Sequence, residues 1–217
     1  MSNVGAATVD MESGLPGGTG RSIVEHKMTA AGATKAAKGA PEAWPLTVQA
    51  YHTLGEMGLI PDNTELLYGQ IFKKISKSPL HSFLHQWLID ALQSHLPPGT
   101  YLRVEQPVTC RDSEPEPDLA VVRGGKRDYR QEHPHTAELV IEVCVSSHDY
   151  DRSKLRAYAG AGVKEVWLVL APEKQIEVHR QPMGEQFRQR ILHGPGGRLA
   201  SVAVAGFEID LDDMFAG

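Results

Sequence analysis

The stretch ELVIEVCVSSHDYDRSK, residues 138–154, decides the fold of this chain. Its first half is an apolar run typical of a buried strand, expected at 139–145, with Glu142 in the middle. Its second half turns polar and predicts a loop and then a helix from about Asp151 to Ala159. A second apolar run, EVWLVLA, follows at 165–171. A strand, a helix and a strand in this order predict an α/β domain with a mixed β-sheet core flanked by helices.

Further elements are expected on both sides of this unit. Residues 79–96 carry apolar side chains at helical spacing and predict the longest helix. Its apolar stripe comprises Leu80, Phe83, Leu84, Trp87, Leu88, Ala91 and Leu92. Residues 64–76 predict two short strands with a turn at Tyr68 and Gly69, and a short helix is expected before Gly58. Other strands are expected within 100–110, 119–122, 175–181, 186–192 and 202–215.

Length and composition narrow the class of protein. A chain of 217 residues, 41% hydrophobic and 23% charged, is long enough for one sizeable globular domain. We predict a disordered N-terminal tail over 1–44, rich in Gly, Ala, Ser and Thr, and a folded domain over 45–217. The formal net charge of -5 excludes a generic basic DNA-binding protein, so nucleic acid would have to bind a local basic patch.

The sequence also indicates where the protein works. Two cysteines, Cys110 and Cys144, are too few for a disulfide framework and favour a reducing compartment. The first twenty residues lack the basic and apolar regions of a secretory signal. No run approaches the roughly 18 apolar residues that a membrane span requires. We therefore expect a cytoplasmic protein without membrane contact.

Glu142 is the first candidate for chemistry. Side chains alternate along a strand, so Glu142 should share a face with Val140 and Cys144. If a helix covers each face of the sheet, this carboxylate is desolvated and needs a partner. Asp118 directly follows a proline at the edge of another predicted strand. Two convergent carboxylates on neighbouring strands suit Mg²⁺ or Mn²⁺, which prefer hard oxygen ligands.

Lys154 is the third candidate. The sequence places it in the first turn of the helix after Glu142, at the carboxyl end of the strand, where α/β sheets usually hold their sites. A cation there opposes the helix dipole. A lysine beside a metal-bound water can orient the water or stabilise charge on a phosphate oxygen. Structural alternatives remain: Glu142 paired with an arginine, Asp118 as a turn residue, and Lys154 as a solvated helix residue.

The segments EPDLAVVRG, 116–124, and LVIEVCVSSHDYDRSKLRAYAGAGVKEVWLVLAPEKQIEVHRQ, 139–181, resemble the Uma-two restriction-endonuclease family, a branch of the PD-(D/E)XK nuclease superfamily. The resemblance covers roughly 46–215 and implies a restriction-endonuclease-like fold. It implies that Asp118 and Glu142 are the catalytic acids and metal ligands. It also implies that Lys154 replaces the superfamily lysine, because Cys144 stands where that lysine usually lies. Glu65 matches the acidic residue of the family's first strand pair, as a further metal contact.

Several other residues are candidates for weaker reasons. His81 and His85 are four residues apart on the long helix, but HSFLH lacks the glutamate of HExxH, so a structural role is favoured over zinc. The resemblance places a histidine at the position of His81, as an accessory to the site. Cys144 is interpreted as a core residue. Two basic groups could contact nucleic acid: Lys73, Lys74, Arg123, Lys126 and Arg127.

Two functions from different classes follow. The first is a metal-dependent endonuclease that hydrolyses DNA phosphodiester bonds with Mg²⁺ or Mn²⁺, by analogy a homodimer that cuts both strands. The second is an inactive nuclease-fold module that binds nucleic acid or a partner protein. Metal binding at Asp118 and Glu142, and a Lys154 amine close to both, would separate them.

Overall fold

The βαβ unit predicted from 138–170 lies at the centre of a six-stranded mixed sheet with strand order β3-β4-β5-β6-β7-β8. The computed structural model describes residues 43–146 and 148–216, all within a unit that spans 39–217. Strands β5 and β6 run parallel, and every other neighbouring pair in this sheet is antiparallel. The predicted tail lies almost wholly outside the described residues. The described part contains no helix long and apolar enough to cross a membrane.

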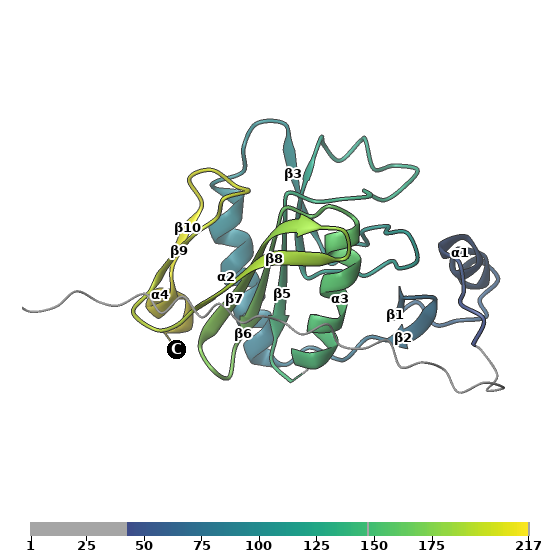
Figure 1. Cartoon of the computed structure of the whole chain (residues 1–217), viewed down its shortest axis with the longest axis horizontal. Coiled ribbons are helices and arrows are strands. Elements are labelled where there is room, and N and C mark those ends of the chain that lie inside the picture. Colours follow the sequence, from purple (N-terminus) through teal and green to yellow (C-terminus); the bar gives the residue numbers. More distant parts are fainter. Residues whose placement is uncertain (1–42, 147, 217) are drawn as a thin grey trace, which may run out of the picture. The chain divides into compact units, whose positions relative to one another are not determined.

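The elements follow one another as Figure 1 labels them. The helices are α1 Val48–Glu56, α2 Pro79–Gln93, α3 His148–Gly160 and α4 Leu211–Phe215. The sheet strands are β3 Thr100–Val104, β4 Leu119–Arg123, β5 Leu139–Cys144, β6 Glu165–Leu170, β7 Gln175–Met183 and β8 Gln186–His193. Two separate hairpins pair β1 Thr64–Leu67 with β2 Gln70–Lys73, and β9 Arg198–Ala200 with β10 Glu208–Asp210.

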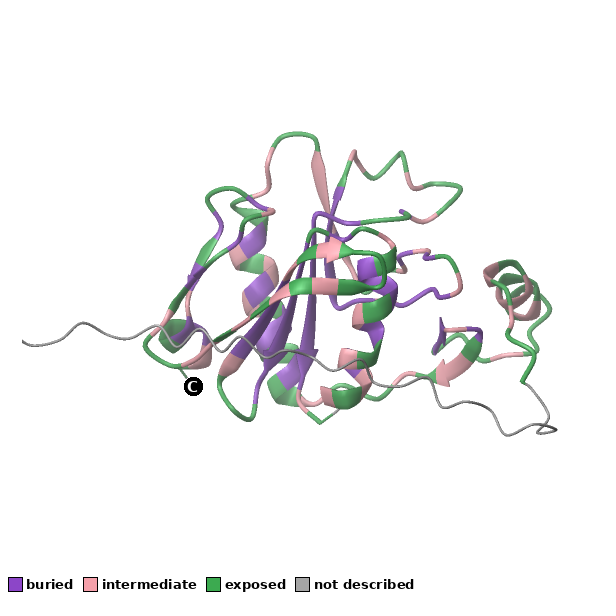
Figure 2. Cartoon of the chain, in the orientation of Figure 1, coloured by how far each residue is buried: buried purple, intermediate pink, exposed green. Residues whose placement is uncertain are grey.

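Helices α2 and α3 cover opposite faces of the sheet. Leu84, Leu88 and Leu92 of α2 pack with Leu139 and Ile141 in one hydrophobic core. A second core on the other face joins Ala157 and Tyr158 of α3 to Val140 and Cys144. Both β5 and β6 are buried along their whole length, as Figure 2 shows. The predicted alternation is therefore confirmed, and Glu142 lies on the α3 face.

The turn at Tyr68 and Gly69 is also confirmed, with a physical reason. Both residues have positive φ angles, 52° and 73°, as the tight turn of a two-residue hairpin requires. A side chain at Gly69 would collide with Pro45, because a Cβ there would lie 2.4 Å from the Pro45 Cβ. This turn fixes the hairpin that carries Glu65 on β1.

Helix α3 begins earlier than the sequence indicated. It starts at His148 rather than near Asp151, with Asp149 and Asp151 in its first turn. Lys154 therefore lies in the second turn, and the argument that it opposes the helix dipole was wrong. The acidic residues after Ser146 are N-terminal helix residues, which complement the positive end of the dipole. The cost of Lys154 comes from burial, since the residue is only 4% exposed.

Two other predicted elements need correction. The apolar stripe of α2 does not extend through its first turn, where Leu80 and Phe83 are about half exposed and His81 is buried instead. That turn meets the polar start of β4, as the bond from His81 to Asp118 shows. In the C-terminal segment, only 208–210 is a strand. Helix α4 follows because the Asp210 side chain accepts hydrogen bonds from the Asp212 and Asp213 amides.

The register places charged residues in one row across the sheet. Leu119 lies opposite Ile141, so the next step of the antiparallel register brings Asp118 opposite Glu142. Glu142 pairs with Leu168 on β6, and Leu168 pairs with Glu177 on β7. Three carboxylates therefore lie at the same level of the sheet, near the carboxyl end of β5.

Candidate active site

Lys154 is the centre of a buried charge cluster. Its Nζ lies 3.3 Å from an oxygen of Glu65 and 3.3 Å from an oxygen of Glu142. A third carboxylate, that of Asp151, is 3.8 Å away on the same helix. The side chains of Lys154, Glu65 and Glu142 are each no more than 5% exposed. The structure thus brings together three residues predicted from distant parts of the sequence.

Two tyrosines of α3 fix the carboxylates. The Tyr158 hydroxyl donates to Glu142 Oε1 at 2.6 Å, and the Tyr150 hydroxyl donates to Glu65 Oε1 at 2.8 Å. Each tyrosine is four residues from Lys154, so all three lie on one face of the helix. The other oxygen of Glu65 accepts from the Glu116 amide at 3.0 Å. These bonds orient the cluster and exclude water from it.

The cluster holds more negative than positive charge. Burial raises the pKa of Glu142 to about 8, and the nearby Asp118, Asp151 and Glu65 carboxylates reinforce this rise, which Lys154 opposes. Burial alone would lower the pKa of Lys154, but attraction to Glu142, Glu65 and Asp151 raises it. Lys154 is therefore firmly protonated, whereas Glu142 is held near the point of losing its proton. A further cation would relieve that imbalance.

Asp118 is held by a different set of groups. Its Oδ1 lies 3.1 Å from Lys77 Nζ, and its Oδ2 lies 3.2 Å from His81 Nε2. The Val143 amide donates to Oδ2 at 2.8 Å. Burial would raise the pKa of Asp118, but His81, the Val143 amide and Lys77 hold it well below its usual range. His85 Nε2 is 3.2 Å from the Asp118 carbonyl oxygen, so the predicted histidine pair lies beside this acid.

The predicted metal ligands fit a divalent cation in chemistry but not as one gathered ligand group. Residues 43–146 and 148–216 contain no group of three or more His, Cys, Asp or Glu side chains placed to hold a metal ion. Asp118 and Glu142 contribute oxygens on adjacent strands, and oxygen is the ligand atom that Mg²⁺ and Mn²⁺ prefer. In this arrangement Lys154 and Lys77 supply the counter-charge instead.

The predicted basic groups divide between the two ends of the sheet. Lys74 Nζ lies 2.6 Å from a Glu116 oxygen, next to the Glu65 bond, and Lys73 is exposed on the same hairpin. Arg123 lies at the far end of β4 from Asp118, about five residues or roughly 17 Å along the strand. It pairs with Glu138 at 2.7 Å. Lys126 and Arg127 follow Arg123 in the chain, so their loop begins at the end of β4 that is far from Asp118.

The structure also tests the predictions for Cys144 and for the pairing of Glu142, and it adds residues to the site. Cys144 is fully buried, and burial strongly raises the pKa of its thiol, which makes it a core residue. Within the described ranges, no arginine forms an ion pair with Glu142, so that structural alternative is wrong. Lys77, Tyr150 and Tyr158 were missed as site residues. The spacing of the two tyrosines from Lys154 was an available signal, whereas the contact of Lys77 was not.

Comparison with known proteins places the chain in a family and supports its fold. Residues 56–212 match the model of the Uma2 family, described as "Putative restriction endonuclease". The chain belongs to this family. A solved structure described as a "putative nuclease belonging to DUF820" from Anabaena variabilis ATCC 29413 has a similar fold, with a TM-score of 0.64 and 18% identity. The similarity covers 75% of this chain and 97% of that one. No curated protein matches the chain.

Proposed function

We propose that this protein is a metal-dependent endonuclease that hydrolyses phosphodiester bonds in DNA. The observation that carries the proposal is the buried Lys154 amine, 3.3 Å from both Glu65 and Glu142. A solvated lysine would not be buried among three carboxylates. Membership of a restriction-endonuclease family supports nuclease chemistry for the same residues.

The roles of the residues follow from their contacts. Asp118 and Glu142, with support from Glu65, would hold Mg²⁺ or Mn²⁺, which when bound polarises a phosphoryl oxygen and acidifies water. Lys154 would orient the attacking water or stabilise the negative charge that develops on the phosphate. Tyr158 keeps the Glu142 carboxyl in place through its hydroxyl. His81, which contacts Asp118, would act as an accessory that holds this acid in position.

We further propose a homodimer that acts in the cytoplasm. Cutting both strands of a duplex with one site per chain requires two chains or two binding events. The two cysteines are free and buried, which agrees with a reducing compartment.

A plasmid-nicking assay with Mg²⁺ or Mn²⁺ tests this function. We expect metal-dependent nicking that falls about a hundredfold or more in Glu142→Gln and in Lys154→Met. Matched controls are Glu208→Gln and Lys164→Met, which remove exposed or half-exposed members of surface ion pairs. Both controls should cut at the normal rate.

The other outcomes are equally informative. Equal cutting by the wild type and Glu142→Gln would identify a contaminant or another site. A wild type that neither cuts DNA nor binds Mn²⁺ in calorimetry would favour the inactive nuclease-fold module. One feature supports that module: Asp118 already has the Lys77 ammonium as a counter-charge and His81 as a hydrogen-bond partner.

A further inference from the structure

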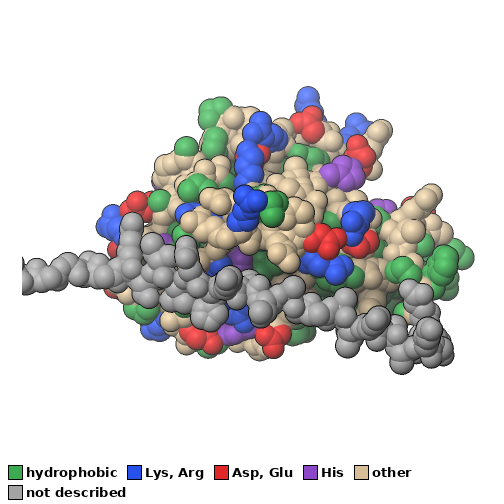
Figure 3. Space-filling model, viewed as in Figure 1, with side chains coloured by type: hydrophobic (Ala, Val, Ile, Leu, Met, Phe, Trp, Pro, Cys, Tyr) green, Lys and Arg blue, Asp and Glu red, His purple; other side chains and the backbone are tan. Residues whose placement is uncertain are grey.

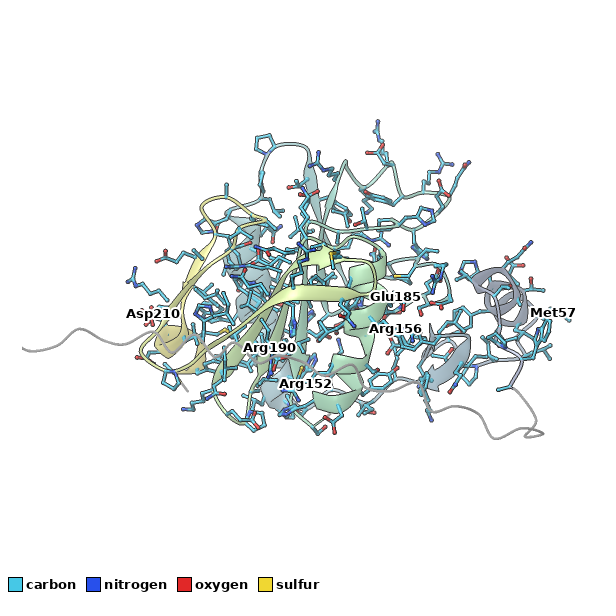
Figure 4. All side chains as sticks on the ribbon, in the orientation of Figure 1. Met57, Arg152, Arg156, Glu185, Arg190 and Asp210 are labelled. Carbon is cyan, nitrogen blue, oxygen red and sulfur yellow. The ribbon has the colours of Figure 1, made fainter. Side chains whose placement is uncertain are left out.

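Glu177 is a second buried glutamate on the same face of the sheet as Glu142, and it forms ion pairs with two arginines. Its Oε2 lies 3.0 Å from Arg152 Nη2 and 2.6 Å from Arg190 Nη2. Its Oε1 lies 2.7 Å from His179 Nε2. We call Glu177, Arg152, Arg190 and His179 the arginine cluster. Figure 4 shows Arg152 on α3 and Arg190 on β8 close together.

In the arginine cluster, the two arginines carry more positive charge than the one buried carboxylate neutralises. One carboxylate faces two guanidinium groups, and each arginine uses only its Nη2 for that carboxylate. The Arg190 side chain is 60% exposed and that of Arg152 is 34% exposed, whereas Glu177 is only 2% exposed. Asp149 lies 3.8 Å from Arg152 Nη1 but is fully exposed. Guanidinium donors therefore face solvent above a buried acid that fixes them.

The position of the arginine cluster relates it to the candidate active site. Glu142, Leu168 and Glu177 occupy one row of the sheet, so a single strand separates the two glutamates. Two strand spacings amount to about 10 Å. The two clusters are therefore close enough for phosphates of one DNA strand to contact both.

The chain as a whole does not carry a positive net charge. On the face seen in Figure 3, basic and acidic side chains are interspersed rather than separated into a large basic field. The net charge of the chain is -5. Arg123 and Lys164, which the sequence or composition would suggest, both pair with Glu138 at the far end of β4. DNA contact therefore depends on local groups of cations. The exposed Lys126, Arg127 and Arg130 of the loop after β4 form one such group, and the arginine cluster forms another that is nearer the candidate active site.

We propose that Arg152 and Arg190 form a phosphate-binding subsite for the DNA strand that is cut at the Glu142–Lys154 cluster. This inference rests on the proposed function and names the residues that hold the substrate. The subsite contacts a phosphate a few nucleotides from the scissile one and fixes the path of the strand across α3. Phosphate contacts of this kind set position and affinity, not base sequence.

Binding of a fluorescein-labelled DNA duplex in EDTA, followed by anisotropy over a series of NaCl concentrations, tests the subsite. Arg190→Gln leaves Glu177 paired with Arg152 and His179, so the fold should persist. We expect about a fivefold loss of affinity near 0.1 M salt and a decrease of about one in the slope of log K against log salt. Arg190→Lys keeps the charge and should restore the slope.

A matched control separates the subsite from general charge loss. Arg198→Gln removes an arginine that is 71% exposed and pairs with Glu208 and Asp210, outside the six-stranded sheet. It should bind DNA like the wild type. Arg152→Gln removes charge from the same cluster independently and should also lower the slope. Circular dichroism spectra confirm that each variant is folded.

Each other outcome overturns the subsite. Unchanged affinity and slope in both Arg190→Gln and Arg152→Gln would show that the arginine cluster does not contact DNA. An equal loss in Arg198→Gln would show a diffuse charge effect. A wild type that nicks plasmid while these variants bind normally refutes the subsite alone. A wild type that neither binds nor cuts DNA refutes the proposed function as well.

Discussion

Glu142 and Glu177 are buried in one row of the sheet, but their pKa values are shifted in opposite directions. Glu142 and Glu177 have side chains that are 3% and 2% exposed, and only Leu168 separates them across the sheet. Burial raises the pKa of Glu142 to about 8. Burial also acts to raise the pKa of Glu177, but His179, Arg190 and Arg152 hold it well below its usual range.

The contrast shows that the charges around a buried acid, together with how deeply it is buried, decide its protonation state. Glu177 has a surplus of cations and is a satisfied structural anion. Glu142 shares one lysine with Glu65 and Asp151 and is electrostatically unsatisfied. A fold does not gain stability from the second arrangement, which makes it the stronger candidate for function.

The largest expected effect is on stability when each glutamate is neutralised. Glu177→Gln leaves two arginines without their carboxylate and should lower the free energy of unfolding by about 3 kcal/mol, at the low end for a broken buried ion pair because both arginines reach solvent. Glu142→Gln removes an acid that the fold keeps mostly protonated at pH 7 although the unfolded chain would ionise it, so this substitution should raise rather than lower the free energy of unfolding. Urea denaturation at pH 7 in EDTA measures both.

Equal destabilisation by the two substitutions would contradict this comparison. It would mean that Glu142 is ionised and well paired in the folded protein, like Glu177. Glu208→Gln, at a surface ion pair with Arg198, is the control and should change stability by no more than about 1 kcal/mol.

The second effect is the dependence of stability on pH. The folded state holds the Glu142 proton more tightly than the unfolded chain, because its pKa rises from 4.5 to about 8. Stability should therefore fall as pH rises through this window, by on the order of 3 kcal/mol. The raised pKa of Lys154 acts only above 10.5, and the lowered pKa of Glu177 acts only below 4.5.

Urea denaturation at intervals from pH 5 to pH 9 in EDTA tests this dependence. The decline should be nearly absent in Glu142→Gln, which cannot ionise at that position. A decline of the same size in that variant would assign the proton to another group.

The fold was largely predictable because its signals are local. The apolar runs around Glu142 and at 165–171, with a helix between them, predicted the parallel pair that the structure contains. Alternation along β5 predicted the face of Glu142 correctly. The start of α3 and the C-terminal helix α4 were missed, because both depend on acidic residues near a helix start, which also resemble loop residues.

The site was only partly predictable because its contacts are long-range. Glu65 and Lys154 approach each other across 89 residues of sequence, and only the family resemblance suggested both. The bond from Lys77 to Asp118 spans 41 residues and left no pattern to detect. Arg123 shows that residues close in sequence can also lie far apart in the fold. It is near Asp118 in sequence, but an extended strand carries it to the other end of the sheet.

The smallest expected effect isolates the charge on Glu142. Tyr158→Phe removes the hydroxyl that donates to Glu142, and should cost about 1 kcal/mol at pH 6, where the acid is neutral. At pH 9 the acceptor is largely ionised, and the cost should rise to about 2 kcal/mol. Tyr129→Phe is the control, because that hydroxyl donates to the Arg123 carbonyl, which does not titrate. If urea denaturation gives Tyr158→Phe the same cost at both pH values, Glu142 keeps one charge throughout, and the contrast with Glu177 loses its electrostatic basis.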